Sequence, residues 1–363
     1  MRDKNLLRIL AGGAVVTAAI VTSLTWSHDP PNAPSRVSKA AAAEVPTGDP
    51  DDPLAIAPAA GASDAGTTSD TSTVANAVTT KVYDVAALVH PSSKYLGVIL
   101  DGVPASLAPV TAFGGVTGKQ PDMVEFPVRF GDRFDARAVR SVYDAGALPV
   151  IRWEPTGTAM SAIAGGASDA AVIDYAKRIR ALDLPVAINF APAMNGNWYT
   201  WGTPKTAATD FVAAWRHVHD LFAANGAGNV IWLWAPHAVD TSTAVPLAPL
   251  YPGDAYVDWV GIGGSFTAAG KHTYGGVFGP TATQIAAFSR KPTLIVETGA
   301  AASPAEPAEI KELWRAVAGY RGVIGLVWSE RGETAGHGIA ADPSALAEFK
   351  MMATDPTFGF VVK

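Results

Sequence analysis

The feature that most constrains the fold is a repeated alternation of short apolar runs with amphipathic stretches beyond Tyr95. Most of these runs are nearly continuously apolar, which is typical of parallel strands buried on both faces. Eight such runs over roughly 270 residues fit a closed (β/α)8 TIM barrel better than an open doubly wound sheet. The strands are expected at Tyr95–Leu100, Met123–Phe130, Leu148–Glu154, Pro185–Ala191, Asn229–Ala235, Val257–Gly263, Pro292–Glu297 and Val323–Trp328.

The clearest helix prediction follows Thr203-Pro204, because proline is favoured in the first turn of a helix. Gly226 is expected to end this helix. No glycine-rich phosphate motif follows the first predicted strand, which weakens a nucleotide-binding interpretation. The apolar positions of the helix are spaced three and four residues apart and so share one face: Ala208, Phe211, Trp215, Val218 and Phe222.

Composition excludes several classes of function. The net charge is −6 and no long basic run occurs, which argues against nucleic acid as a partner. The absence of cysteine excludes disulfides, thiolate metal sites and a cysteine nucleophile. No HExxH or similar ligand spacing is present, so we expect neither a metal site nor a cofactor.

The N-terminus predicts the compartment. Arg2, Lys4 and Arg8 precede an uncharged, mostly apolar run at Ile9–Trp26, whose length is near the roughly 20 residues of a membrane-spanning helix. The positive-inside rule then places the rest of the chain outside the cytoplasm. A cleaved signal peptide is the alternative, although the small-residue stretch Ala40–Ala43 lies well beyond the apolar run. Residues 1–26 are therefore expected to form a cytoplasmic stub and membrane anchor, or a signal peptide, with the domain extracytoplasmic or secreted.

A spacer is expected to follow. Residues 27–80 are rich in Pro, Ala, Ser, Thr and Asp and nearly without aromatic residues. Such a segment cannot bury enough apolar surface to offset its ordering entropy, so it is expected to be a disordered linker. The barrel is expected to occupy residues 81–363.

Polar residues at the ends of the predicted strands indicate the site, because active sites of this fold form at the carboxyl ends of the strands. Carboxylates can act as acid, base or nucleophile on a glycosidic bond, and indole rings stack on sugar rings. Their combination predicts a carbohydrate site. The polar candidates are Asp101, Glu154, Asn195, His237, Glu297 and Glu330, and the aromatic candidates are Trp153, Trp198, Tyr199, Trp201 and Trp328.

The segment Phe190–Gly202, which reads FAPAMNGNWYTWG, resembles the signature of glycoside hydrolase family 26. In this family of β-mannanases and related β-glucanases, a His-Glu pair precedes Met-Asn-Gly and a Trp-rich stretch. The resemblance implies a clan A barrel that acts on or binds a β-linked polysaccharide, mannan-like or glucan-like. Further similar motifs follow in order at Trp215–Val218, Asn229–Pro236, Tyr251–Ile262 and Lys291–Gly299.

The chain departs from the family pattern at two positions. Pro192 and Ala193 stand where the family has His-Glu, so the acid/base position is degenerate, whereas Glu297 occupies the position of the nucleophile. Gly264-Ser265 replaces a Gly-Tyr pair whose tyrosine steadies the nucleophile in the family. Retaining glycosidases need two carboxyl groups about 5 Å apart. Loss of general acid catalysis typically lowers the rate by about 10²–10⁴-fold.

Several candidates have a structural alternative. Glu154 and Glu330 are possible substitute acids, but Glu154 could instead pair with Arg152, and Glu330 with Arg331 or another local cation. Asn195 is expected either to shape the loop after the fourth strand or to contact ligand.

The aromatic candidates also have a structural alternative to ligand binding. Trp198 and Trp201 could stack on sugar or serve as core aromatics at the end of the barrel. His237 is expected only to line the site.

Three functions remain open. The first is a catalytically weakened or inactive barrel that binds a β-linked polysaccharide. The second is an active endo-β-glycosidase with a relocated acid, and the third is a scaffold component of a polysaccharide assembly complex. Ala193 favours the first, while the intact Glu297 supports the second.

Overall fold

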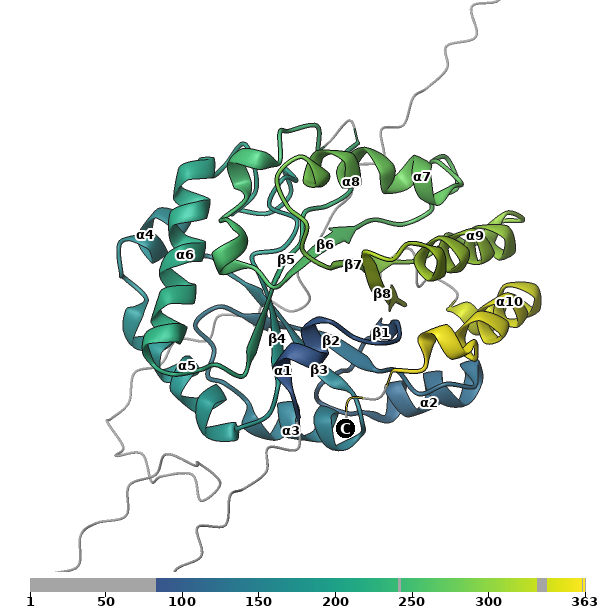
Figure 1. The fold of residues 1–363 in the computed structure, drawn as a ribbon, viewed down its shortest axis with the longest axis horizontal. Helices are drawn as coiled ribbons and strands as arrows, with labels where there is room; N and C mark the ends of the chain where they lie inside the picture. Colours follow the sequence, from purple (N-terminus) through teal and green to yellow (C-terminus); the bar gives the residue numbers. More distant parts are fainter. Residues whose placement is uncertain (1–82, 241–242, 332–337, 361, 363) are drawn as a thin grey trace, which may run out of the picture. The chain divides into compact units, whose positions relative to one another are not determined.

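The computed structural model describes residues 83–240, 243–331, 338–360 and 362. Its central feature is a closed barrel of eight parallel strands in sequential order, with β8 paired to β1 (Figure 1). This confirms the predicted (β/α)8 fold class. The strands are β1 Tyr95–Ile99, β2 Met123–Arg129, β3 Leu148–Glu154, β4 Val186–Phe190, β5 Val230–Trp234, β6 Trp259–Gly263, β7 Thr293–Thr298 and β8 Val323–Ser329.

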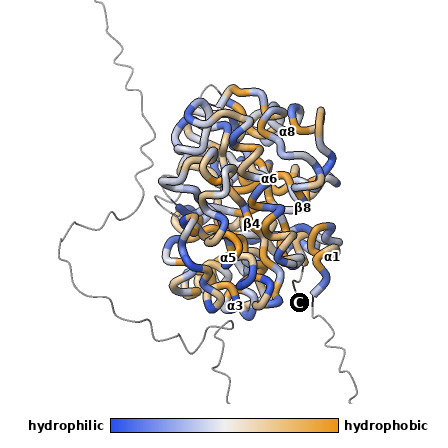
Figure 2. The backbone as a smooth tube through the Cα atoms, turned by 90° about the vertical axis from the view of Figure 1, so that its left-hand side faces the viewer, coloured by the Kyte–Doolittle hydropathy of each residue, from blue (hydrophilic) through white to orange (hydrophobic). Residues whose placement is uncertain are grey.

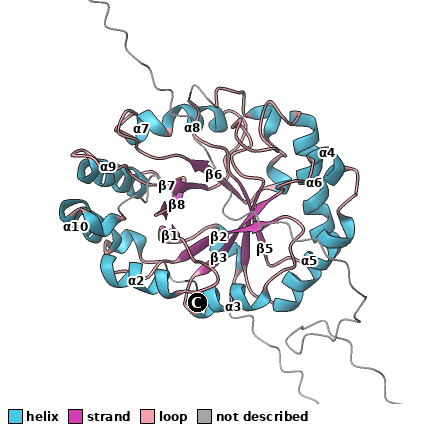
Figure 3. Cartoon of the chain, turned by 180° about the vertical axis from the view of Figure 1, so that it is seen from behind, coloured by secondary structure: helices cyan, strands magenta, loops and turns pink. Residues whose placement is uncertain are grey.

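The helices surround the strands, as Figure 3 shows from behind. The α-helices are α1 Val85–Val89, α2 Ala108–Thr117, α3 Ala136–Asp144, α4 Met160–Ala164, α5 Asp169–Leu182, α6 Ala208–Ala224, α7 Tyr274–Val277, α8 Gly279–Ala286, α9 Glu306–Gly319 and α10 Pro343–Ala353. Short 3-10 helices are η1 Ala248–Leu250, η2 Asp254–Tyr256, η4 Ile339–Ala341 and η5 Pro356–Phe358.

The predicted buried face of α6 is confirmed, but the helix starts later in the sequence than predicted. The helix begins at Ala208, after Ala207 as N-cap, and not directly after Thr203-Pro204. Gly226 follows the end of the helix, has φ +73° and so adopts a conformation that favours glycine. Four of the five predicted apolar positions are fully buried: Phe211, Trp215, Val218 and Phe222.

Side chains alternate between the barrel interior and the helix layer, as the pleat of a strand requires. In β3, for example, Arg152 points inward and Trp153 outward, where its ring stacks on Tyr175 of α5 at a centroid distance of 4.5 Å. Figure 2 shows the resulting distribution: the apolar stretch at β4 lies inside, and most strongly hydrophilic stretches lie at the periphery.

The amino-terminal end of the barrel is closed by aromatic residues and α1. The rings of Tyr95 in β1 and Trp259 in β6 meet edge to face at 5.8 Å. Tyr95 donates its hydroxyl hydrogen to the Leu88 carbonyl, and the Trp259 indole donates to the Val89 carbonyl, both in α1. A ligand site on the barrel axis is therefore left to the opposite end, where the strands have their carboxyl termini.

The described part of the chain contains no helix that is long and apolar enough to span a membrane. The predicted anchor at Ile9–Trp26 and the predicted linker at residues 27–80 lie outside the described residues.

Candidate active site

Arg152 is the centre of the candidate site. It lies on the inner side of β3 and is only 4% exposed. Its Nε lies 2.7 Å from Oε1 of Glu154, its Nη1 forms a close ion pair with Oε1 of Glu297, and its Nη2 donates to the Tyr199 hydroxyl at 2.5 Å. Burial alone would lower the pKa of this guanidinium, but Tyr199, Glu154 and Glu125 outweigh that effect and raise it. One cation thus joins side chains from β3, β7 and the loop after β4.

A second, fully buried carboxylate lies on the inner side of the neighbouring strand β2. Glu125 is completely buried, and Asn189 of β4 donates its amide Nδ2 to Oε1 at 3.1 Å. Burial raises the pKa of Glu125, and Arg152 only partly opposes this. Among the described residues, Glu125 Oε2 and Asn189 Oδ1 have no hydrogen-bond partner.

Sequence reasoning missed Glu125 and Asn189, although a signal was present. Each is a polar residue with apolar neighbours on both sides, within Met123–Phe130 and Pro185–Ala191 respectively. A buried polar group is costly unless it is partnered, so its presence in a core strand indicates a specific role.

Glu297 reaches the site because the end of β7 is irregular. The register between β7 and β8 shifts between Ile295 and Thr298, and Glu297 has φ +44°. Val296 already belongs to the inner apolar cluster, so the irregularity allows the next side chain to turn toward the barrel mouth as well. Positive φ is uncommon for a residue other than glycine and is concentrated at functional sites.

The backbone just after β4 is strained in the same way, but the strained residues there have no ionisable side chain. Ala191 and Ala193 have φ +46° and +53°. Ala193 is 6% exposed, and its N–H donates to the Ala235 carbonyl at the end of β5 at 2.8 Å. The backbone is thus strained at the position that the sequence predicts to be the degenerate acid/base position, and its side chain is a methyl group.

The aromatic loop after β4 lies against Arg152. Tyr199 stacks on Trp201 with the ring centroids 4.2 Å apart and nearly parallel planes, while Trp198 meets His237 edge to face at 5.2 Å. Trp201 is buried and donates its indole N–H to the Pro192 carbonyl, so it supports the loop. Trp198 and Tyr199 are partly exposed and remain available as ligand-facing rings.

Two glycines make this loop possible. A Cβ on Gly196 would lie 2.5 Å from the Trp198 ring, and a Cβ on Gly202 would lie 2.1 Å from the Gly196 carbonyl oxygen. A methyl group at residue 202 would therefore have to displace the backbone, whereas one at residue 196 would have to displace the Trp198 ring.

Asn195 and His237 connect the ends of β4 and β5. The Asn195 amide donates to the His237 carbonyl and accepts from the His237 N–H, both at 2.8 Å. Asn195 is buried, so its predicted ligand contact is wrong and its predicted role in shaping the loop is correct. His237 is partly exposed and lies beside Trp198, as expected of a residue that only lines the site.

Three of the predicted ligand-binding tryptophans are buried: Trp201, which supports the loop, and Trp153 and Trp328, which face the helix layer. Trp153 is 1% exposed and Trp328 is 3% exposed. Both point outward from the barrel: Trp153 stacks on Tyr175 of α5, and Trp328 meets Phe349 of α10 edge to face at 5.1 Å. The prediction that they bind sugar is wrong, because the alternation of the strand directs them to the helix layer.

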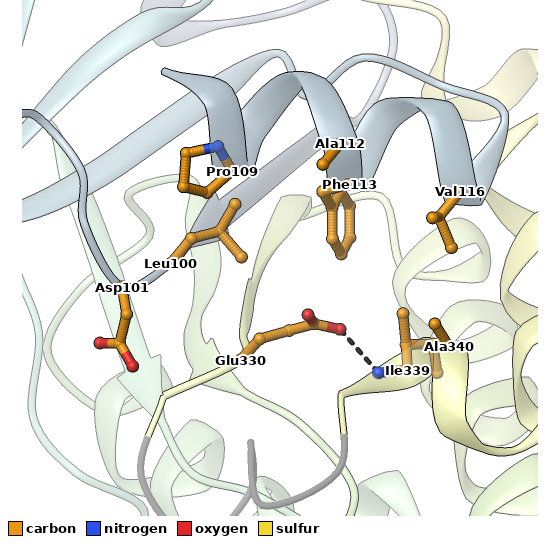
Figure 4. Close-up of a pocket in the computed structure, with 9 residues that line it drawn as sticks. All are labelled: Leu100, Asp101, Pro109, Ala112, Phe113, Val116, Glu330, Ile339 and Ala340. Carbon is orange, nitrogen blue, oxygen red and sulfur yellow. Dashed lines mark hydrogen bonds between the residues drawn. The ribbon is translucent and has the colours of Figure 1, made fainter. Parts of the chain in front are cut away.

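Glu330 lies in a separate pocket and is not joined to Arg152. Its Oε1 accepts the Ile339 N–H at 2.8 Å, as drawn in Figure 4. Arg331, its predicted partner, instead forms an ion pair with Asp101 at 3.1 Å. The predicted pairing of Glu330 with Arg331 is therefore wrong, and its predicted role as a substitute acid stays a prediction. The pocket measures about 250 Å³ and is lined by Leu100, Asp101, Pro109, Ala112, Phe113, Val116, Glu330, Ile339 and Ala340.

Ser265 donates its hydroxyl hydrogen to the Glu297 carbonyl at 3.3 Å. The side chains that the structure brings together at the mouth are therefore Arg152, Glu154, Tyr199 and Glu297. Within the described residues, no group of three or more His, Asp or Glu side chains is arranged to hold a metal ion.

Comparison with known proteins connects this barrel to carbohydrate enzymes. The family described as Glycosyl hydrolase family 26 matches residues 155–320. Endoglucanase H of Acetivibrio thermocellus is 27% identical over 264 residues, which are 69% of this chain and 29% of that protein. A mannan endo-1,4-beta-mannosidase of Bifidobacterium adolescentis is 27% identical over 93 residues, which are 25% of this chain and 9% of that protein. The chain thus spans less than a third of the length of either relative.

Solved structures have the same fold. The catalytic domain of a GH26 endo-beta-1,4-mannanase from Bacillus sp. JAMB-750 aligns with a TM-score of 0.58 at 16% identity, covering 74% of this chain and 88% of that one. A GH26 beta-mannanase from Bacteroides ovatus aligns with a TM-score of 0.55 at 16% identity, covering 76% and 92%.

Proposed function

Because the chain has the β-mannanase-like fold of glycosyl hydrolase family 26, we propose that it binds a β-linked glycan, mannan-like or glucan-like, at the barrel mouth and hydrolyses it weakly or not at all. The observation that carries the proposal is Ala193. The position after β4 from which a carboxyl group would protonate the leaving oxygen holds a buried methyl group.

The remaining catalytic carboxylate is also restrained. Glu297 is held in an ion pair by the buried guanidinium of Arg152. Without a general acid, the departing sugar must leave as an unprotonated alkoxide, which typically lowers the rate about 10²–10⁴-fold. Glycan binding needs neither proton transfer nor nucleophilic attack, so the partly exposed rings of Trp198 and Tyr199 support it unimpaired.

Product analysis by mass spectrometry tests this proposal. The full chain is incubated with β-mannans, β-glucans and xylans beside Glu297→Ala and Ala193→Glu. Little or no oligosaccharide from the wild type, retarded migration in gels that contain one of the glycans, and more product from Ala193→Glu would support it. Abundant product that disappears in Glu297→Ala would overturn it. A protein without any glycan affinity would favour the scaffold hypothesis instead.

A second candidate function, an active endo-β-glycosidase, is favoured by one observation. Glu154 and Glu297 contact neighbouring nitrogens of the same guanidinium, so the two carboxyl groups are close together, as a retaining mechanism requires. Opposing it, the Arg152 guanidinium already contacts both carboxyl groups. If Glu154 is the relocated acid, Glu154→Gln abolishes product formation as completely as Glu297→Ala. Unchanged product formation in Glu154→Gln would exclude this role.

We propose further that the barrel lies outside the cytoplasm, attached through the apolar run Ile9–Trp26 or released after its cleavage. The basic residues before this run support that orientation. In intact cells, externally added protease should degrade the barrel or the barrel should be found in the medium. Protection from protease until the cells are lysed would contradict this proposal.

A further inference from the structure

Tyr199 links the loop after β4 to the carboxylate at the end of β7. Its hydroxyl accepts a hydrogen bond from Nη2 of Arg152 at 2.5 Å, and Nη1 of the same guanidinium forms a close ion pair with Glu297. Within the described part of the chain, this is the one ion pair of Glu297. A guanidinium is planar and rigid, so fixing one of its nitrogens restricts where the others can lie. The tyrosine hydroxyl therefore acts on the position of Glu297 through Arg152.

The contacts of Arg152 differ in how far they fix its orientation. Glu154 and Glu297 attract it through ion pairs, whose energy depends mainly on distance. The contact with Tyr199 is a hydrogen bond, whose energy depends on angle as well. Glu154 also belongs to the same strand as Arg152, whereas Tyr199 belongs to a separate segment. The Tyr199 hydroxyl is thus the contact best placed to orient the guanidinium.

The ring of Tyr199 is itself held in place. It stacks on Trp201 with the ring centroids 4.2 Å apart and the planes 9° from parallel. Trp201 is buried, and its indole N–H donates to the Pro192 carbonyl at 2.8 Å. A side chain can orient another group only if packing and hydrogen bonds lock its own position. Tyr199 meets this requirement from the buried side of the loop.

The environment of Tyr199 suits positioning better than proton transfer. Burial raises the pKa of its hydroxyl, and Arg152 only partly opposes this. A general acid works best when its pKa lies near the operating pH, so a phenol with a raised pKa is a poor proton donor near neutral pH. Its hydroxyl stays protonated there and keeps one set of hydrogen bonds.

We propose that Tyr199 is a positioning residue for Glu297: its hydroxyl fixes the Arg152 guanidinium, which in turn holds the carboxylate toward the anomeric carbon of a bound sugar. The inference rests on the proposed function, because it needs a mouth that binds a glycan and still contains Glu297. The aromatic loop then has two roles, contact with the glycan and control of the geometry of attack. A substrate whose leaving group needs no acid reports on that geometry alone.

Dinitrophenolate release from dinitrophenyl β-cellobioside and β-mannoside by the full chain in detergent tests this inference. In the first turnover, an oxygen of Glu297 bonds to the anomeric carbon while the bond to the phenolic oxygen breaks and its electron pair leaves with dinitrophenolate. Water then displaces the carboxylate, which releases the sugar and one proton to solvent. The first-turnover rate at saturating substrate therefore measures how well Glu297 is positioned, and the half-saturating concentration measures binding.

Tyr199→Phe removes the hydroxyl and keeps the ring. It should lower the first-turnover rate at least about tenfold, because it deletes a hydrogen bond to a charged group, while the half-saturating concentration stays within about twofold. Tyr256→Phe is the matched control, since Tyr256 is also partly exposed and its ring centroid lies 5.2 Å from the Arg216 guanidinium carbon. It lies in η2, before β6, and its replacement should change neither value. An equal loss in the control would contradict the inference.

A double-mutant cycle shows whether Tyr199 acts through Arg152. Arg152→Lys keeps the charge but not the planar fork that contacts both Tyr199 and Glu297. Adding Tyr199→Phe to Arg152→Lys should then lower the rate by less than about twofold more. A further tenfold loss would mean that the two residues act independently and would overturn the inference. If Arg152→Lys does not fold, the comparison of Tyr199→Phe with the wild type still decides.

The outcomes separate this inference from the proposed function. A wild-type rate in Tyr199→Phe, or a change in the half-saturating concentration alone, would overturn the inference and leave glycan binding intact. A wild-type protein that migrates slowly in glycan gels but releases no dinitrophenolate would do the same. A wild-type protein without any glycan affinity would overturn the proposed function and, with it, the inference.

Discussion

At the scale of single residues, Arg152 does more than any other side chain to define the mouth. It is almost completely buried and contacts Glu154, Glu297 and Tyr199. A buried charge is tolerated only with partners, and its removal leaves those partners without compensation. The same contacts hold Glu297 at the barrel mouth.

Replacing Arg152 with methionine should lower the free energy of unfolding by about 3 kcal/mol, because Glu125 then remains buried without its cation. The double variant Glu125→Leu with Arg152→Met should recover much of this loss, since apolar residues can replace a buried ion pair. Denaturant unfolding followed by tryptophan fluorescence measures both. Equal stability of wild type and Arg152→Met would contradict this account of the interior.

A second residue-scale prediction concerns Asp122, at the amino-terminal end of β2. Its carboxylate accepts the Leu96 N–H and pairs with Lys119, but burial still raises its pKa from 3.8 to about 6. A carboxyl group whose pKa is higher in the folded state stabilises the fold at low pH. That contribution is lost as pH rises through about 6.

Because of Asp122, the free energy of unfolding should therefore fall by at most about 3 kcal/mol when the pH rises from 4 to 7. Asp122→Asn should remove this part of the pH dependence, whereas Asp220→Asn on the surface should not. Denaturant titrations at several pH values provide the comparison. Parallel profiles for wild type and Asp122→Asn would show that Asp122 titrates normally.

At the scale of elements, the loop between β4 and α6 determines how the mouth is shaped. Asn195 ties it to the end of β5, Trp201 fixes it to Pro192, and Tyr199 contacts Arg152. The two glycines in this loop are constrained differently, because Gly196 faces a side chain and Gly202 faces a backbone carbonyl.

Gly202→Ala should therefore cost more stability than Gly196→Ala. A new methyl group at residue 202 must displace the backbone, at a cost of about 1–3 kcal/mol, whereas at residue 196 the Trp198 ring can move. Gly196→Ala should mainly weaken glycan binding. Thermal unfolding combined with affinity gels distinguishes the two effects, and the reverse order of stabilities would contradict this account of the loop.

The elements also show how much the sequence could predict. Continuous apolar runs predicted all eight strands, and the motifs at Phe190–Gly202 and Lys291–Gly299 placed Ala193 just after the fourth strand and Glu297 at the end of the seventh. The sequence did not reveal which face each side chain occupies near a strand end. There, Trp153 and Trp328 turned outward, and a positive φ turned Glu297 toward Arg152.

At the scale of the whole molecule, the chain has a complete barrel, and we propose that its catalytic site is incomplete. Its fold is that of glycosyl hydrolase family 26, and the strained backbone of the active site persists at Ala193 and Glu297. On the proposed function, the group that is missing is the proton donor. A site that lacks only its acid should still react with substrates whose leaving group needs no protonation.

The most direct test is to measure dinitrophenolate release from dinitrophenyl β-glycosides of mannose and cellobiose beside hydrolysis of the matching polysaccharides. The account predicts release from the activated glycosides that disappears in Glu297→Ala, with polysaccharide turnover at least about 10²-fold slower. Comparable turnover of both substrates would show that the chain has a functional acid. No release from either would show that the site lacks more than its acid. Either result would contradict the account.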